Sequence, residues 1–251
     1  MFIFSTDIDG TIYDSLETAT HFAEFWEALT TGSEQEGKLI FNTGRSIGDT
    51  LGLLSEVPLP QPDFIIGGVG TEIYSCEQSE KIDDWESYLV GDGWEADGVS
   101  SLVERLIPDI EAQPPECNTN VKRSWFWNDR DLADIAQLEK SLSDEGIVAQ
   151  VVYSSQRDLD ILPRRANKGN ALHWLCDRLD FGHAKIIVAG DSGNDLSMFG
   201  HADVHGIVVA NASAELQAID FKTTGHFLAQ APCAYGVVEG LRHFLTPSIV
   251  A

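Results

Sequence analysis

The chain has 251 residues, of which 40 are acidic and 16 basic, so its formal net charge at pH 7 is −24. A surface this negative repels phosphate backbones and anionic headgroups, which argues against nucleic acid or a membrane as the partner. An anionic substrate would need a local cationic site within this negative field.

Strand-like apolar runs alternate with helix-like segments in the first third of the chain. Residues 2–6 predict a buried strand, and the apolar spacing over residues 21–29 predicts a helix. A second strand is expected at 38–42, a second helix at 47–54 and a third strand at 63–67. Strands that alternate with helices predict a parallel sheet built from βαβ units.

Residues 79–163 have a different pattern. Helical spacing and alternating apolar residues predict two helices and three strands, the last two strands paired as a hairpin: helices at 99–110 and 131–143, strands at 121–127, 148–153 and 158–162. This pattern predicts a small α+β domain that is inserted into the larger fold, with boundaries near Ser79 and Pro163.

The strand and helix alternation returns in the last third of the chain. The expected elements are, in order, a helix at 168–179, a strand at 186–189, a short helix at 195–200, a strand at 206–209 and helices at 214–218 and 237–244. We therefore predict an α/β protein. Its Rossmann-like core comprises residues 1–78 and 164–251, and its inserted domain comprises residues 79–163.

Acidic residues follow two of the predicted strands. Asp7 and Asp9 come directly after the first strand, and Asp191 and Asp195 follow the strand at 186–189. The carboxyl ends of parallel strands meet at the same edge of a sheet, so we expect these four carboxylates to converge. Buried carboxylates need a counter-charge, and oxygen ligands suit Mg²⁺, so the pattern predicts a magnesium site.

Phosphate-binding groups accompany these acids. Thr43 and Gly44 follow the second strand with a hydroxyl and a backbone N–H, and Lys168 opens a predicted helix, where an anion is favoured. Each motif alone has an ordinary explanation as a turn, a helix cap or a solvated charge. Together they provide the parts that a phosphoryl transfer needs.

The chain resembles the haloacid dehalogenase superfamily of phosphatases in four motifs: Asp7-Ile-Asp9-Gly10-Thr11, Thr43-Gly44-Arg45, Lys168-Gly169-Asn170 and Gly190–Asp195. Two further stretches, Gly68–Tyr74 and Ser154–Ala171, are similar to its sucrose-phosphate phosphatase branch. The resemblance covers essentially the whole chain, and it identifies the inserted domain with the family's α/β cap.

The resemblance implies roles for the matching residues. Asp7 would attack phosphorus and form an aspartyl-phosphate, and Asp9 would protonate the leaving oxygen and then activate water. The implied Mg²⁺ ligands and supports are Asp7, the backbone carbonyl of Asp9, Asp191, Asn194 and Asp195, and the implied phosphate-binding residues are Thr43, Gly44 and Lys168.

The resemblance also implies a sugar-binding set. In the core it comprises Arg45, Gly70, Thr71, Glu72 and Asn170, and in the cap Lys122, Ser124, Arg157, Asp158 and Asp160. A solvated hairpin explains the cap residues equally well. Trp125 and Trp127 share one strand face, where core packing is favoured over sugar stacking.

One position departs from the family pattern. The pattern runs Lys-x-Ser-Tyr-His, whereas this chain has Phe126 in place of the histidine. A lost hydrogen bond at that position would alter the preferred sugar phosphate. Sucrose 6-phosphate is therefore the leading substrate, and mannosylfructose phosphate and related glycosyl phosphates stay open.

The expected function is a Mg²⁺-dependent sugar-phosphate phosphatase, with a sugar-phosphate synthase as a further partner. Two alternatives stay open: a sugar phosphomutase or phosphotransferase, and a non-catalytic sugar-phosphate-binding partner of a glycosyltransferase. No basic leader and no apolar run of membrane-spanning length is visible, and the four cysteines form no C-x-x-C pair, so we expect a cytoplasmic protein.

Overall fold

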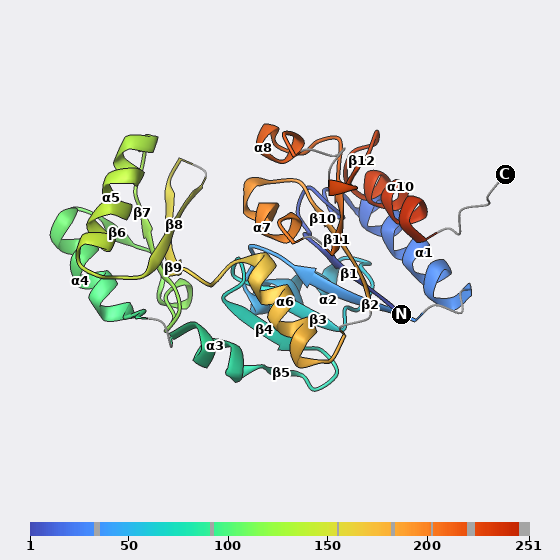
Figure 1. The fold of residues 1–251 in the computed structure, drawn as a ribbon, viewed down its shortest axis with the longest axis horizontal. Coiled ribbons are helices and arrows are strands. Elements are labelled where there is room, and N and C mark those ends of the chain that lie inside the picture. The colour runs from blue at the N-terminus through green and yellow to red at the C-terminus, as the bar shows by residue number, and fades with distance from the viewer. Residues whose placement is uncertain are drawn as a thin grey trace. The chain divides into compact units, whose positions relative to one another are not determined.

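The computed structural model describes residues 1–32, 36–90, 93–154, 156–181, 184–201, 203–219 and 224–245. The chain divides into two compact units, each built on its own sheet (Figure 1). The core unit comprises Met1–Ile82 and Asn167–Ala251, and the inserted unit comprises Asp83–Ala166. Within the described residues, no helix combines the length and the hydropathy needed to cross a bilayer.

The core unit is built on an eight-stranded sheet with the order β12-β11-β10-β1-β2-β3-β4-β5. Its strands are β1 (Phe2–Thr6), β2 (Gly37–Asn42), β3 (Phe64–Gly67), β4 (Glu72–Ser75), β5 (Glu80–Lys81), β10 (Lys185–Gly190), β11 (Val204–Val208) and β12 (Phe227–Leu228). The pairs from β12 to β3 are parallel, which confirms the predicted α/β fold with a parallel sheet.

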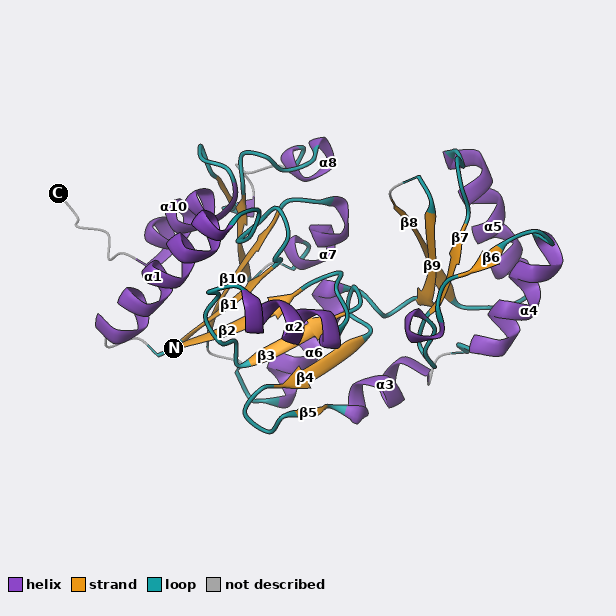
Figure 2. Cartoon of the chain, turned by 180° about the vertical axis from the view of Figure 1, so that it is seen from behind, coloured by secondary structure: helices purple, strands orange, loops and turns teal. Residues whose placement is uncertain are grey.

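Helices lie on both faces of this sheet. They are α1 (Leu16–Gly32), α2 (Ile47–Glu56), α6 (Lys168–Arg178), α7 (Leu196–Phe199), α8 (Ala214–Gln217) and α10 (Cys233–Leu245), with a 3₁₀ turn at Gly193–Asp195. Figure 1 shows α6 in front of the sheet, and Figure 2 shows α2 in front from the opposite side. Aromatic packing joins α1 to β1, with the ring of Phe4 6.1 Å from Phe22 and 5.9 Å from Trp26.

An antiparallel edge, β3-β4-β5, was not predicted from the sequence. The turn before β4 places Gly68, Val69 and Gly70 in succession at positive φ, so the chain reverses directly instead of crossing over through a helix. The chain leaves the core unit after Ile82, because β5 still pairs with β4 beyond the expected boundary at Ser79.

The inserted unit is an antiparallel sheet with the order β6-β7-β9-β8, accompanied by three helices. Its elements are α3 (Asp83–Val90), α4 (Ala96–Leu106), β6 (Glu111–Ala112), a 3₁₀ turn (Pro115–Cys117), β7 (Arg123–Phe126), α5 (Leu132–Asp144), β8 (Ala149–Ser154) and β9 (Asp158–Pro163). The predicted hairpin is β8–β9. Trp125 and Trp127 are 2% and 8% exposed within its apolar core, which confirms packing as their role.

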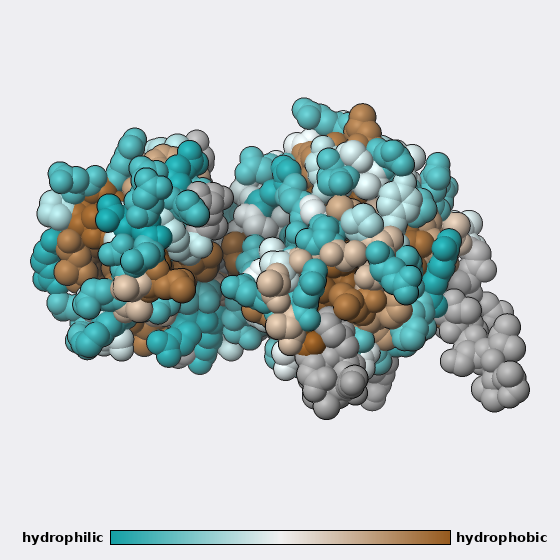
Figure 3. Space-filling view, turned by 90° about the horizontal axis from the view of Figure 1, so that it is seen from above, coloured by the Kyte–Doolittle hydropathy of each residue, from teal (hydrophilic) through white to brown (hydrophobic). Residues whose placement is uncertain are grey.

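Hydrophilic residues cover much of the face drawn in Figure 3, with hydrophobic patches between them, in a chain with 40 acidic and 16 basic residues. Two of the four cysteines, Cys176 and Cys233, are buried.

Candidate active site

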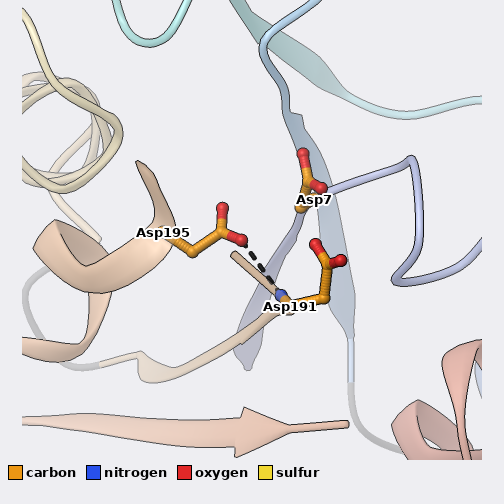
Figure 4. Close-up of side chains that lie close together, drawn as sticks. All are labelled: Asp7, Asp191 and Asp195. Carbon is orange, nitrogen blue, oxygen red and sulfur yellow. Dashed lines mark hydrogen bonds between the residues drawn. The ribbon is translucent and has the colours of Figure 1, made fainter. Parts of the chain in front are cut away.

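Three carboxylates meet where β1 and β10 end. These strands are parallel neighbours with Thr6 opposite Ala189, so Asp7 and Asp191 emerge side by side at one edge of the sheet. Asp195, in the following 3₁₀ turn, completes the group. One oxygen from each carboxylate lies within 4.8 Å of the others (Figure 4). The predicted convergence is therefore confirmed for these three residues.

A buried lysine lies beside this group. The Lys168 side chain is fully buried, and its Nζ donates to Asp7 Oδ1 at 2.7 Å and to Asp195 Oδ1 at 2.6 Å. The other oxygen of Asp195 accepts from the backbone N–H groups of Asp191 and Ser192, both at 3.0 Å. Asp195 is thus held from both sides, and it fixes the backbone that carries Asp191.

Burial shapes the charges of this site. Desolvation raises the pKa of Asp7 to about 7, although Lys168 lowers it, and Asp195 raises it further. Burial also raises the pKa of Asp191, as does the charge of Asp195. Burial alone would lower the pKa of Lys168, but Asp7 and Asp195 outweigh it, so its pKa is raised and the side chain stays cationic.

The donor set suits a hard divalent cation. Asp7 and Asp191 present carboxylate oxygens, the ligands that Mg²⁺ prefers. Burial raises the pKa of both carboxyl groups, and a bound cation would stabilise their charged forms. Gly10 allows this close approach. Its φ is +76°, and a Cβ at this position would lie 2.5 Å from Asp191 Oδ2.

Asp9 does not join the group, contrary to the expected convergence of four carboxylates. Its side chain is half exposed and bonded at both oxygens by Arg45, from Nε and Nη2 at 2.7 Å each. Asp9 lies beyond the strand end, where the N–H groups of Thr11 and Ile12 bond to Ile8 O and form a tight turn. That turn directs its carboxylate to Arg45.

Thr43 and Gly44 follow β2, as predicted. The Thr43 side chain is buried, and its Oγ1 accepts from the Arg45 N–H at 3.2 Å. Gly44 faces Asn194, because a Cβ at this position would lie 3.9 Å from Asn194 Nδ2. The Asn194 side chain is exposed, and its Oδ1 accepts from Ser192 Oγ at 3.0 Å.

The other expected sugar-binding residues of the core unit lie in the turn before β4 and in the first turn of α6. Gly70 is pressed against Asn167, since a Cβ would lie 2.4 Å from its carbonyl oxygen. Thr71 is buried and donates to Gly68 O. Glu72 forms an ion pair with Lys81 on β5. The N–H of Asn170 donates to the side chain of Asn167, the N-cap of α6.

The polar residues expected in the cap form two clusters, on and directly beside β7 and β9 of the inserted unit. In the first, Asp160 accepts from Ser124 Oγ at 2.6 Å and pairs with Lys122 Nζ at 3.0 Å. The second centres on Asp158, which accepts from Arg157 Nε at 3.2 Å and from the side chain of Gln113 at 3.1 Å. The contact of Gln113 with Asp158 was not predicted from the sequence, because Gln113 is a single amide in a loop and belongs to no recognised motif.

This arrangement of carboxylates and lysine on a parallel sheet, with an inserted α+β unit, defines a phosphatase of the haloacid dehalogenase superfamily. A family model for sucrose-6F-phosphate phosphohydrolase matches residues 1–245, so the chain belongs to that family and is a sugar-phosphate phosphatase. The family expected from the motifs is thereby confirmed.

Three known proteins are particularly similar to the chain. A mannosylfructose-phosphate phosphatase of Agrobacterium fabrum is 41% identical over 96% of both chains. Sucrose-phosphatase 1 of tobacco, Nicotiana tabacum, is 33% identical over 95% of this chain, which spans 58% of that longer protein. The crystal structure of the sucrose-phosphatase of Synechocystis sp. PCC6803, in complex with sucrose and phosphate, aligns with a TM-score of 0.81 at 30% identity over 97% of both chains.

Proposed function

We propose that the chain hydrolyses a disaccharide phosphate through an aspartyl-phosphate on Asp7. The observation that carries this proposal is the buried Lys168 between Asp7 and Asp195. A site that only binds sugar phosphate gains nothing from a carboxylate beside the bound phosphate, because the two repel each other. A nucleophile that must approach a phosphate needs such a cation.

Mannosylfructose phosphate is our first candidate substrate, because the relative that acts on it is 41% identical over nearly the whole chain. Sucrose 6-phosphate is the second, supported by the family model and by the Synechocystis enzyme. Phe126 bears on the choice. The guanidinium of Arg157 lies 4.7 Å from its ring centroid, so an aromatic face stands where the family pattern has a histidine.

The core residues divide the reaction between them. Mg²⁺, held by Asp7, the backbone carbonyl of Asp9 and Asp191 with Asn194 and Asp195 in support, would neutralise the charge of the phosphate. An oxygen of Asp7 attacks phosphorus as the bond to the sugar oxygen breaks. Thr43, the N–H of Gly44 and Lys168 contribute hydrogen-bond donors and positive charge to the transferred phosphoryl group.

Asp9 supplies the proton steps in this proposal. It gives a proton to the leaving sugar oxygen and later takes one from the water that hydrolyses the aspartyl-phosphate. Both of its oxygens are bonded to Arg45 in this structure, so the pair has to open before Asp9 reaches a substrate. Arg45 is then free to contact the sugar phosphate, together with the residues expected at the sugar: Gly70, Thr71, Glu72, Lys122, Ser124, Arg157, Asp158, Asp160 and Asn170.

We also assign the inserted unit as the specificity cap, and we expect the enzyme to act in the cytoplasm beside the glycosyltransferase-type synthase that makes its substrate. Co-purification of the two enzymes would establish a stable complex. If the two active enzymes elute separately, they form no stable complex, and the synthase only supplies the substrate.

The direct test is phosphate release from mannosylfructose phosphate, sucrose 6-phosphate and simple hexose phosphates in the presence of Mg²⁺. We expect kcat/KM for one disaccharide phosphate to exceed that for hexose phosphates by about 100-fold or more. Equal, weak rates on all substrates would contradict a disaccharide-specific cap. Transfer of the phosphoryl group to a sugar hydroxyl, without release of inorganic phosphate, would indicate a phosphomutase or a phosphotransferase.

Metal binding should depend on pH. The raised pKa of Asp7, about 7 against 3.8 for a free side chain, contributes stability that is complete below about pH 4 and is lost as the pH rises through about 7. The raised pKa of Asp191 acts in the same direction. Mg²⁺ replaces the lost protons, so it should raise the melting temperature more at about pH 8 than at about pH 5. Asp191→Asn is the control that should remove most of this shift, and an equal Mg²⁺ effect at both pH values would contradict the assignment.

Phe126→His should change the substrate preference. An imidazole at this position can donate to a sugar hydroxyl, whereas a phenyl ring cannot. We expect the ratio of kcat/KM for sucrose 6-phosphate to that for mannosylfructose phosphate to rise about fivefold or more, the value of one hydrogen bond. Hydrolysis of p-nitrophenyl phosphate, which lacks a sugar, serves as the control and should stay constant. An unchanged ratio would remove Phe126 from the sugar site.

A further inference from the structure

Asn42 is a fully buried amide that no motif marks, and it lies next to the chemistry. It is the last residue of β2, directly before Thr43. Its Nδ2 donates to the backbone carbonyl of Lys168 at 2.9 Å, and lies 3.4 Å from Ser5 Oγ on β1 and 3.3 Å from Met198 Sδ on α7. One side chain therefore touches all three segments that carry Asp7, Lys168 and Asp195.

The backbone at the start of α6 is held on its other sides as well. The Gly169 N–H donates to Ser197 Oγ at 3.0 Å, and a Cβ on Gly169 would lie 2.0 Å from the Ser197 carbonyl oxygen. The N-cap side chain of Asn167 accepts from the Asn170 N–H at 2.8 Å. Of these contacts, only the hydrogen bond from Asn42, which lies at the end of β2, is made to the carbonyl of Lys168 itself.

Stability alone does not account for this amide. The carbonyl oxygen of Asn42 finds no hydrogen-bond partner among the described residues, and a buried polar atom without a partner is costly. An apolar or smaller side chain would avoid that cost. The amide, unlike those side chains, donates a hydrogen bond to the backbone carbonyl of Lys168.

We propose that Asn42 is a positioning residue, which holds the Lys168 backbone so that its ammonium lies between Asp7 and Asp195. The role rests on the proposed function, because the positioned ammonium serves the attack of Asp7 on phosphorus. Asn42 touches no reacting atom and acts through Lys168.

The test uses Asn42→Thr, which keeps a side chain of similar size in the strand but loses the amide. We expect kcat to fall about tenfold or more and KM to stay within about threefold, because a misplaced charge costs the reaction more than the binding. Thr50→Val is the matched control. It removes the hydrogen bond that the buried Thr50 side chain donates from Oγ1 to Ser46 O at the start of α2, and it should leave kcat within about twofold.

A double-mutant cycle separates positioning from general packing. In a Lys168→Arg background, the ammonium that Asn42 is proposed to position has already been replaced by a guanidinium. Asn42→Thr should therefore lower kcat by less than about twofold in that background. Losses that multiply independently would contradict the proposal, as would a wild-type kcat in Asn42→Thr. If Asn42→Thr does not fold, Ser197→Ala weakens the same turn of α6 from its less buried side, and it should lower kcat with the same coupling to Lys168.

A second measurement is independent of turnover. The fully buried Lys168 should resist acetylation by an amine reagent in the wild-type protein, and Asn42→Thr should make it reactive, as mapped by mass spectrometry. Thr50→Val should keep it protected. Exposure of Lys168 without any wild-type phosphatase activity would refute the proposed function and leave the positioning contact in place. Full protection in Asn42→Thr would refute the positioning role.

Discussion

Asp7→Asn is expected to abolish turnover while the fold persists. The amide is isosteric with the carboxylate and can still accept from Lys168, but it cannot form an aspartyl-phosphate, so phosphate release should fall about 10⁴-fold or more. Burial raises the pKa of Asp7 to about 7, so its charged form, present at about pH 8, is unfavourable in the folded protein. In the absence of metal, Asp7→Asn should therefore be no less stable than the wild type at about pH 8.

The experiment compares phosphate release and thermal unfolding of the wild type, Asp7→Asn and Asp109→Asn. Asp109 is exposed on the inserted unit, so its replacement controls for loss of one acidic charge. Retained activity in Asp7→Asn would exclude Asp7 as the nucleophile. A variant that unfolds would assign Asp7 to the structure instead of the chemistry.

Lys168→Met is expected to cost both activity and stability. It removes the cation between Asp7 and Asp195, whose side chains are 8% and 0% exposed, and leaves two carboxylates facing each other. Loss of one partner from a buried ion-pair network costs about 3–5 kcal/mol. We expect kcat to fall about 10³-fold or more, because the attacking carboxylate loses its neighbouring positive charge.

The pH dependence of this variant identifies the cause. Lys168 lowers the pKa of Asp7, so its removal raises that pKa further, and the unfolding deficit should be larger at about pH 8 than at about pH 5. Lys140→Met is the matched control. It breaks the ion pair between Lys140 and Asp144, whose side chains are 64% and 63% exposed. The loss in free energy of unfolding should therefore be less than about 1 kcal/mol. A similar cost for the two lysines would contradict the buried network.

The sequence was sufficient to predict the parallel core of the fold. Apolar runs at β1 and β10 mark buried strands, and the acids that follow them must meet at one edge of the sheet, so Asp7 and Asp191 could be predicted to converge. The antiparallel edge escaped prediction because β4 and β5 are short. Their direction depends on the positive φ angles at Gly68, Val69 and Gly70, which residue type alone does not fix.

The partners of the site residues were harder to predict than the residues themselves. Sequence motifs indicated Lys168 as a phosphate ligand, but its burial between two carboxylates follows from the packing of α6 against α7 and β3 and from the hydrogen bond that Asn42 donates to its carbonyl. The Arg45–Asp9 pair depends on a turn geometry that spacing does not encode. Asn42 precedes a recognised motif and reads as an ordinary strand residue, since its contacts come from β1, α6 and α7.

The most direct test of the account is the state of Asp7 during turnover. Wild-type enzyme is mixed with the disaccharide phosphate that it hydrolyses fastest, quenched in acid within a single turnover and digested for tandem mass spectrometry. We predict one added phosphoryl group on the peptide that contains Asp7, assigned to its side chain and absent from Asp7→Asn. Rapid release of inorganic phosphate with no phosphorylated Asp7 at any quench time would contradict the covalent mechanism.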